Sequence, residues 1–197
     1  MIFKRTFDIL FSFFSLLVLS PIILMTSLII KIKYGGPVIF KQKRIGFKGS
    51  SFTIYKFRSM VRGADKLANG TVTVLDDVRV TTFGKFIRKY KIDEIPTIFN
   101  ILIGNMSFVG PRPTVLYDVK KMTKKQKQRH MVLPGLTGLA QIKGNTSLTW
   151  PERIDYDLKY ITNRNLLFDL YIIIKTVILI FKRNIETNPQ GESEWEN

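Results

Sequence analysis

The chain has 197 residues, enough for one domain with a hydrophobic core, and carries 31 Lys and Arg against 15 Asp and Glu, a formal net charge of +16. It contains no cysteine, which excludes disulfides, thiol nucleophiles and cysteine-based metal sites, and a catalytic triad would depend on its single histidine, His130. With 45% hydrophobic and 12% aromatic residues the chain is not a disordered basic tail. The charge therefore predicts a polyanionic neighbour: nucleic acid, an acidic membrane or a phosphorylated substrate.

Residues 7–30 form an almost wholly apolar segment, broken by Asp8 and small hydroxyl residues. As one helix this segment would be roughly 36 Å long, enough to span a hydrocarbon core of about 30 Å. A secretory signal peptide would have a shorter apolar region and a small-residue cleavage site after it, which this sequence does not offer. An ordinary membrane anchor remains as the simple interpretation.

Ser20 and Pro21 interrupt this segment. Proline lacks the backbone donor that a continuous helix needs and usually kinks or breaks it, and Ser20 can bond to the carbonyls that proline frees. Basic residues flank both ends of the segment: Lys4, Arg5, Lys31 and Lys33. Basic flanks tend to stay in the cytoplasm, which a bent helix that enters and leaves on one face satisfies and a single crossing does not. On these residues alone, a spanning and a re-entrant helix both remain open.

Short elements follow the Gly35-Gly36-Pro37 stop. Residues 38–40 and 52–55 predict two strands joined by a glycine-containing turn, 63–78 a turn-rich loop, and the spacing of aromatic residues over 83–90 a helix. Basic residues crowd the predicted hairpin and its surroundings: Lys41, Lys43, Arg44, Lys56, Arg58 and Arg62.

In the second half, Asp93 is predicted to cap a helix that runs to about Ile103 and stops at Gly104. A strand at 105–109, a basic helix at 120–130 and a turn at 134–138 should follow. The next helix should open at Trp150 and place Ile154, Leu158 and Ile161 on one face. Residues 166–181 are apolar but contain Asp169 and Lys175, which favours a helix lying on the membrane surface or packed in the core. The tail after Lys182 is polar.

Asp93 and Glu94 form an acid pair in a basic neighbourhood, followed by Arg112 between Pro111 and Pro113. The simple interpretation is a favourable helix N-terminus followed by a rigid turn. In a second interpretation, Asp93, Glu94 and Arg112 act together in phosphoryl transfer. A carboxylate can attack phosphorus, its neighbour can hold Mg²⁺, and a rigidly held arginine can clamp phosphate oxygens. Surrounding cations would then lower the pKa of the nucleophilic carboxyl and keep it ionised. The chain has no GxxxxGK[ST] or GxGxxG nucleotide motif.

The sequence resembles the bacterial sugar transferase family, the small monotopic phosphoglycosyl transferases, over about residues 3–183. The resemblance rests on Lys4-Arg5-xx-Asp8, Ser20-Pro21 and a series of longer motifs in order. These are "GGPVIFKQKRIG", "FTIYKFRSM", "VRVTTFGKFIRKYKIDEIPTIFNILIGNMSFVGPRP", "RHMVLPGLTGLAQIKG" and "LTWPERIDYDLKY".

The resemblance implies transfer of a phosphosugar from a UDP-sugar to polyprenyl (undecaprenyl) phosphate, with release of UMP. Asp93 matches the family nucleophile that forms a covalent phosphosugar intermediate, and Glu94 its partner; both are candidate ligands of Mg²⁺. The candidate substrate-binding residues are Arg88, Pro111, Arg112, Lys56, Arg58, Arg129 and His130.

The same resemblance implies an α/β, helix-rich, small membrane-associated domain with an N-terminal re-entrant membrane helix and surface amphipathic helices. The expected divisions are 1–33 for the re-entrant helix broken at Ser20-Pro21, 34–183 for the catalytic domain and 184–197 for the polar tail. The implied location is the cytoplasmic face of the bacterial inner membrane. A bilayer with anionic lipids is an expected partner, downstream membrane glycosyltransferases are further candidates, and nucleic acid is not expected.

The chain departs from common family patterns at three motifs. It has Asp93-Glu94-Ile95-Pro96-Thr97 for "DELPQ", Gly104-Asn105-Met106-Ser107 for "GDMS", and Gly144-Asn145-Thr146 where many relatives have "GRN". The arginine replaced by Asn145 removes one candidate phosphate or sugar contact, so sugar specificity is not carried over. The alternative function is a non-catalytic membrane-bound adaptor that binds anions; a nucleic-acid binder would leave residues 7–30 unexplained. The sequence leaves open the sugar, the glycan pathway and the oligomeric state.

Overall fold

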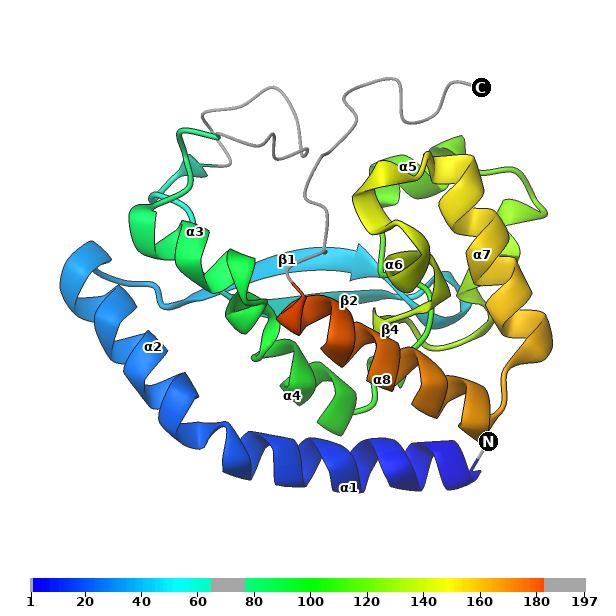
Figure 1. The fold of residues 1–197 in the computed structure, drawn as a ribbon. Coiled ribbons are helices and arrows are strands. Elements are labelled where there is room, and N and C mark those ends of the chain that lie inside the picture. The colour runs from blue at the N-terminus through cyan, green and yellow to red at the C-terminus, as the bar shows by residue number, and fades with distance from the viewer. Residues whose placement is uncertain (1, 65–76, 183–197) are drawn as a thin grey trace.

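The computed structural model describes residues 2–64 and 77–182, so most of the expected loop at 63–78 and the whole polar tail lie outside the described residues. Helices surround two small sheets (Figure 1). The elements of the first half are α1 (Ile2–Val18), α2 (Ser20–Tyr34), β1 (Ile39–Ile45), η1 (Phe47–Gly49), β2 (Ser51–Phe57), α3 (Thr82–Lys89), η3 (Ile92–Glu94) and α4 (Thr97–Leu102). Those of the second half are β3 (Ser107–Val109), α5 (Leu116–Lys121), η4 (Gln126–Met131), β4 (Gly135–Thr137), α6 (Leu139–Lys143), η5 (Asn145–Ser147), α7 (Trp150–Asn163) and α8 (Leu166–Phe181). The predicted helix-rich α/β domain is confirmed.

The long N-terminal helix is broken where the sequence predicts. Helix α1 ends at Val18 and α2 begins at Ser20, which puts Pro21 in the first turn, where a missing backbone donor costs no intrahelical bond. Across the break the two helices bend by 59° and form the angled pair along the lower edge of Figure 1. In the described part of the chain no single helix has the length and hydropathy of a membrane span, whereas this bent pair does when taken together.

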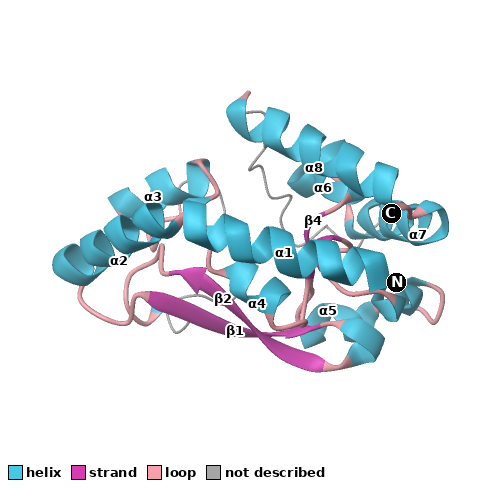
Figure 2. Cartoon of the chain, turned by 90° about the horizontal axis from the view of Figure 1, so that it is seen from below, coloured by secondary structure: helices cyan, strands magenta, loops and turns pink. Residues whose placement is uncertain are grey.

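Polar residues of α1 attach it to the rest of the molecule. The guanidinium of Arg5 donates to the carbonyls of Ile101 (2.6 Å) and Leu102 (2.8 Å) at the end of α4. Asp8 is buried and accepts a hydrogen bond from the backbone amide of Phe108 in β3 (3.1 Å). Seen from below, α1 crosses over α4 (Figure 2). The contacts therefore tie α1 to the helix that directly follows the acid pair; the division of the chain at residue 33 stays a prediction.

The first sheet is the predicted hairpin. Strands β1 and β2 pair antiparallel from Ile39 opposite Phe57 to Ile45 opposite Ser51, with η1 in the connection. Both strands are longer than their apolar residues suggested. Their cross-strand pairs place Gln42, Arg44, Ile54 and Lys56 on one face, because side chains alternate along a strand.

The second sheet corrects the prediction of a turn at 134–138. Gly135–Thr137 is strand β4, which pairs in parallel with β3. A Cβ atom on Gly135 would lie 2.1 Å from the backbone nitrogen of Gly110. The glycine that indicated a turn instead permits two backbones to approach closely.

The predicted basic helix at 120–130 is also wrong, because it is divided between α5 and η4. Met122 has an extended conformation (φ −76°, ψ 139°) and is buried, which ends α5 at Lys121. The helices expected at 83–90, 150 onwards and 166–181 are confirmed as α3, α7 and α8. Helix α7 begins with a capping box, in which Thr149 and Glu152 satisfy each other's backbone amides.

Two clusters of buried side chains form the core. The larger one joins β2, α4, β3, α7 and α8 through residues such as Ile54, Ile101 and Tyr160, and the smaller one joins Ile30 of α2, Phe57 of β2 and Ile87 of α3. Helix α8 buries Asp169 and Ile172. Much of its remaining surface is apolar and exposed, through Leu166, Leu167, Leu170, Tyr171, Ile174, Val177, Ile178 and Phe181.

Candidate active site

A tight turn presents the acid pair. Lys91 adopts a left-handed conformation (φ 56°, ψ 18°) after α3, and the short helix η3 then carries Asp93 and Glu94. The prediction that Asp93 caps the following helix is wrong: α4 starts after Pro96 and no side chain caps it. The turn of η3 separates Asp93 from the first amides of α4. Asp93 is instead 9% exposed, and its buried Oδ1 atom accepts no hydrogen bond from the described residues.

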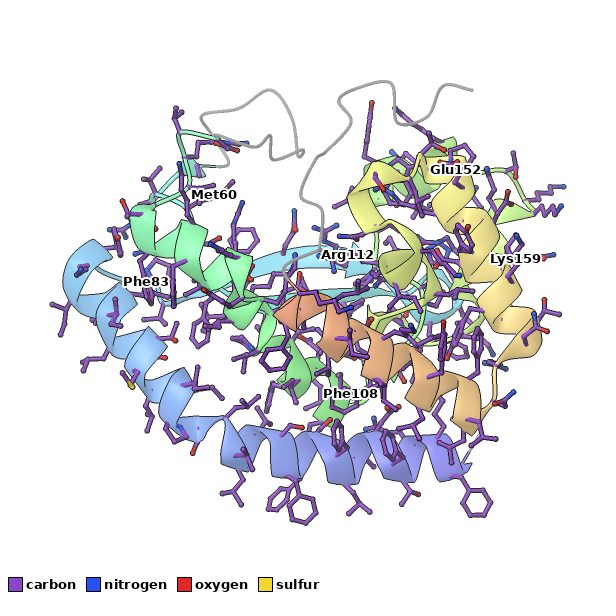
Figure 3. All side chains as sticks on the ribbon, viewed as in Figure 1. Met60, Phe83, Phe108, Arg112, Glu152 and Lys159 are labelled. Carbon is purple, nitrogen blue, oxygen red and sulfur yellow. The ribbon has the colours of Figure 1, made fainter. Side chains whose placement is uncertain are left out.

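Two cations from different elements hold Glu94. The ammonium of Lys56 on β2 lies 2.6 Å from Oε1 of Glu94, and Nη2 of Arg112 donates to the same oxygen at 2.6 Å. The Arg112 Nη1 atom lies 3.4 Å from the other carboxylate oxygen. Arg112 follows β3 and lies near the centre of the molecule in Figure 3. The sequence-predicted residues Glu94, Lys56 and Arg112 therefore meet at one point.

The two carboxyl groups differ in their electrostatics. Burial opposes ionisation of Glu94, but Arg112 and Lys56 outweigh it and hold the Glu94 pKa well below its usual value. Burial raises the pKa of Asp93, and the Glu94 charge raises it further, while Lys56, Lys91 and Arg88 offset only part of this rise. The expected lowering of the nucleophile's pKa by its cations is thus wrong for Asp93, because desolvation of a buried carboxylate exceeds their attraction.

Arg129 contacts the backbone of Arg112. Its guanidinium pairs with Asp157 of α7 at 2.6 and 2.9 Å, and its Nη2 atom also donates to the backbone carbonyl of Arg112 (3.0 Å). Gly135 likewise donates to the carbonyl of Pro111 (2.9 Å). The loop that presents Arg112 is therefore held from two sides by buried groups.

Three other predicted binding residues make contacts outside the acid pair. Arg88 donates to the hydroxyl of Ser59 (2.7 Å). Arg58 donates to the carbonyls of Tyr34 and Gly35 at the end of α2. Burial and the charge of Arg129 lower the pKa of His130 to about 4, so His130 is neutral at pH 7. Binding roles for these three residues stay predictions.

Two cations near the acid pair, Lys91 and Arg44, are not among the candidate binding residues predicted from the sequence. Lys91 carries the left-handed turn, is half-buried, and lies close enough to Glu94 for the two charges to interact. Arg44 of β1 lines a small cavity together with Lys56, Glu94 and Arg112. The sequence placed Arg44 among the crowded cations of the hairpin. The register of β1 with β2 places Arg44 and Lys56 on one face, and that register is not visible in the sequence.

The donor set of the acid pair suits Mg²⁺. The described residues contain no group of three or more acidic, histidine or cysteine side chains placed to hold a metal. Mg²⁺ commonly takes one or two carboxylates and completes its shell with water and substrate phosphates. Asp93 has a buried oxygen free for such a contact, and Glu94 lies next to it in the chain.

Comparison with known proteins places the chain in a family. Residues 1–183 match the family described as "Bacterial sugar transferase". The chain belongs to the bacterial sugar transferase family.

Three relatives illustrate the range of the family. An uncharacterised sugar transferase, EpsL, of Bacillus subtilis (strain 168) is 42% identical over 190 residues, 95% of this chain and 93% of that protein. The UDP-glucose:undecaprenyl-phosphate glucose-1-phosphate transferase of Klebsiella pneumoniae is 42% identical over 187 residues, 90% of this chain and 40% of that protein. The exopolysaccharide production protein PSS of Rhizobium leguminosarum bv. phaseoli is 38% identical over 191 residues, 90% of this chain and 94% of that protein. The chain thus spans nearly all of two relatives and two-fifths of the Klebsiella protein.

Proposed function

We propose that this protein transfers a sugar 1-phosphate from a UDP-sugar to polyprenyl phosphate, such as undecaprenyl phosphate, and releases UMP. Membership of the family and the name of the Klebsiella relative support this reaction class. The observation that carries the proposal is the buried oxygen of Asp93, which accepts no hydrogen bond from the described residues and lies beside a carboxylate already neutralised by Lys56 and Arg112.

In the proposed mechanism Asp93 is the nucleophile. Its carboxylate oxygen attacks the sugar-bearing phosphorus of the UDP-sugar, and the bond from that phosphorus to the bridging oxygen breaks, so that UMP leaves with the electron pair. A phosphate oxygen of the polyprenyl phosphate then attacks the same phosphorus, and the bond to Asp93 breaks. The carboxylate is regenerated, and polyprenyl diphosphosugar is the product.

Glu94 organises the cations around the reacting phosphates. Because Glu94 binds both Lys56 and Arg112, it fixes two positive charges that desolvated phosphates need. Asp93 and Glu94 are also the residues that would hold Mg²⁺, which when bound neutralises charge on the diphosphate. Arg112 is about half exposed at its side chain, so it can contact a substrate while still paired with Glu94.

We place this site at the cytoplasmic face of the bacterial inner membrane, with α1 and α2 as a re-entrant pair. The 59° bend and the outward apolar residues of α1, α2 and α8 support this topology. The basic flanks of the pair suit anionic lipid headgroups. The product would be a substrate for downstream membrane glycosyltransferases.

A trapping experiment tests the reaction. The full-length protein is incubated with Mg²⁺ and UDP-sugars labelled in the sugar, without polyprenyl phosphate, and both UMP release and labelled protein are measured. We expect a covalent adduct for the wild type and none for Asp93→Asn. Asp155→Asn, a change at an exposed carboxyl on α7, serves as the matched control. Normal UMP release by Asp93→Asn would contradict the mechanism, and binding without UMP release by the wild type would favour the non-catalytic adaptor.

A further inference from the structure

Three cationic side chains and the carboxylate of Glu94 line a small cavity. The cavity has a volume of about 20 Å³, room for one water-sized group. Its charged residues are Arg44, Lys56, Arg112 and Glu94, and Asp93 is not among its lining residues. Glu94 can balance one of the three positive charges, so the cavity holds an excess that an anionic oxygen would neutralise. Ile54, Met106 and Leu136 add apolar walls, which strengthen such an interaction by excluding water.

The guanidinium of Arg44 is incompletely used by the protein. Its Nη2 atom donates to Oε1 of Gln42 (2.5 Å), and its Nη1 atom lies 3.5 Å from the carbonyl of Pro113. The Nε atom is buried and has no hydrogen-bond partner among the described residues. Burial, together with the charge of Arg112, lowers the Arg44 pKa to about 10, so Arg44 is still protonated at neutral pH. A buried donor without a partner is costly, so the Nε atom is available to donate to an oxygen of a bound ligand.

We propose that Arg44 binds the nucleotide phosphate of the UDP-sugar in this cavity, which Glu94 lines and Asp93 does not. This assignment rests on the proposed function. When Asp93 attacks the sugar-bearing phosphorus, the bridging oxygen departs with the electron pair of the broken bond, and negative charge grows on the phosphate of the departing UMP. In-line displacement puts that leaving group on the far side of the phosphorus from Asp93. Arg44 and Arg112 are then the residues that stabilise the developing charge.

Measuring the two half-reactions separately distinguishes a role in binding the nucleotide phosphate from a role in binding the lipid phosphate. Adduct formation from labelled UDP-sugar is timed without acceptor, and isolated adduct is then chased either with polyprenyl phosphate or with UMP. For Arg44→Gln we expect adduct formation and its reversal by UMP to slow by about a hundredfold, as for loss of a preorganised charge-stabilising donor. Discharge of the adduct to polyprenyl phosphate should slow by a smaller factor: in-line attack brings the lipid phosphate to the same side of the phosphorus, but no nucleoside holds it against Arg44.

Lys43→Gln is the matched control. Lys43 is exposed and neighbours Arg44 on β1, with its side chain on the opposite face of the strand. The Lys43→Gln substitution removes one positive charge from the same strand and should leave both half-reactions at the wild-type rate. Arg44→Lys should restore only part of the lost rate, because an ammonium lacks the planar fork of a guanidinium. Thermal unfolding of each variant checks that the fold is intact.

A direct measurement of UMP binding tests the proposal independently of the proposed mechanism. Calorimetric titration of the folded variants with UMP needs no turnover, and Arg44→Gln should bind UMP more weakly than the wild type and Lys43→Gln. A wild type that forms no adduct but binds UMP through Arg44 would refute the aspartyl intermediate and leave the phosphate site standing. Slowed discharge to polyprenyl phosphate with normal adduct formation would assign Arg44 to the acceptor and overturn the proposal. Unchanged UMP binding in Arg44→Gln would also overturn it.

Discussion

Arg129 supports Arg112 through the backbone: its Nη2 atom donates a 3.0 Å hydrogen bond to the Arg112 carbonyl while its guanidinium is paired with Asp157. The side chains of Arg129 and Asp157 are each 2% exposed. The half-exposed arginine of the site thus depends on a fully buried ion pair. This arrangement makes the position of Arg112 sensitive to Asp157, a residue of α7 that acts on Arg112 through its pairing with Arg129.

Asp157→Ala should destabilise the protein and disturb Arg112. Removing one partner leaves the buried Arg129 charge uncompensated, which costs about 3–5 kcal/mol. Urea unfolding measures the loss, and weaker inhibition by UMP reports on Arg112. The control is Asp155→Ala on the exposed side of α7, which should stay within about 0.5 kcal/mol of the wild type. Equal stabilities for the two variants would mean that the Arg129–Asp157 pair contributes nothing measurable.

Asp93→Asn should stabilise the protein at neutral pH while removing activity. Burial and the Glu94 charge raise the Asp93 pKa above its ordinary value of 3.8, so the folded state binds this proton more tightly than the unfolded state. Wild-type stability therefore falls as pH rises from about 3.8 through the folded pKa, and an asparagine escapes that loss. Urea unfolding over a pH series should show an excess stability of Asp93→Asn at pH 7 that disappears in acid. A less stable Asp93→Asn at pH 7 would contradict the cost of burying this charge.

Glu94→Gln should lose most activity, and its Mg²⁺ titration should shift to higher concentrations. The substitution removes a candidate metal ligand and releases Lys56 and Arg112 from their shared carboxylate. With metal omitted, UMP should bind more tightly to the variant, because a negative charge has left the site. Lost activity with an unaltered Mg²⁺ titration would limit Glu94 to holding the two cations.

Arg112→Ala should weaken both use of UDP-sugar and inhibition by UMP. Arg112→Lys should recover part of the effect, since lysine keeps the charge but cannot make two parallel hydrogen bonds. Steady-state rates at several UDP-sugar and UMP concentrations measure both properties. Inhibition by UMP that is identical in the wild type and Arg112→Ala would remove this residue from the nucleotide site.

Replacing Ser20 and Pro21 with leucine should alter the topology of the α1–α2 pair. A continuous apolar helix of spanning length would form, and its two basic flanks would then favour the same side of the membrane. We expect a mixed population with Met1 partly outside, and reduced activity. A single cysteine introduced near Met1 can be labelled on intact cells with an impermeant thiol reagent, because the chain has no other cysteine. Labelling of the otherwise unchanged chain would refute the re-entrant topology.

Features that depend on neighbouring residues could be predicted from the amino-acid sequence. The break at Ser20-Pro21, the bounds of α8 and the start of α7 at Trp150 follow from proline chemistry, apolar spacing and capping. The acid pair and Arg112 were identified as candidates because their residue types and motif are visible in one short stretch. Such signals are local, so they persist whatever the rest of the chain does.

Features that depend on distant segments arise only when the chain folds. Gly135 belongs to a strand because β3 lies beside it, and Arg129 turns toward Asp157 because α7 packs there. Burial by the surrounding elements reverses the expected pKa shift of Asp93. Arg44 reaches the cavity beside Glu94 only through the register of β1 with β2. Desolvation and contacts across the chain arise from packing, and no local pattern of residues encodes them.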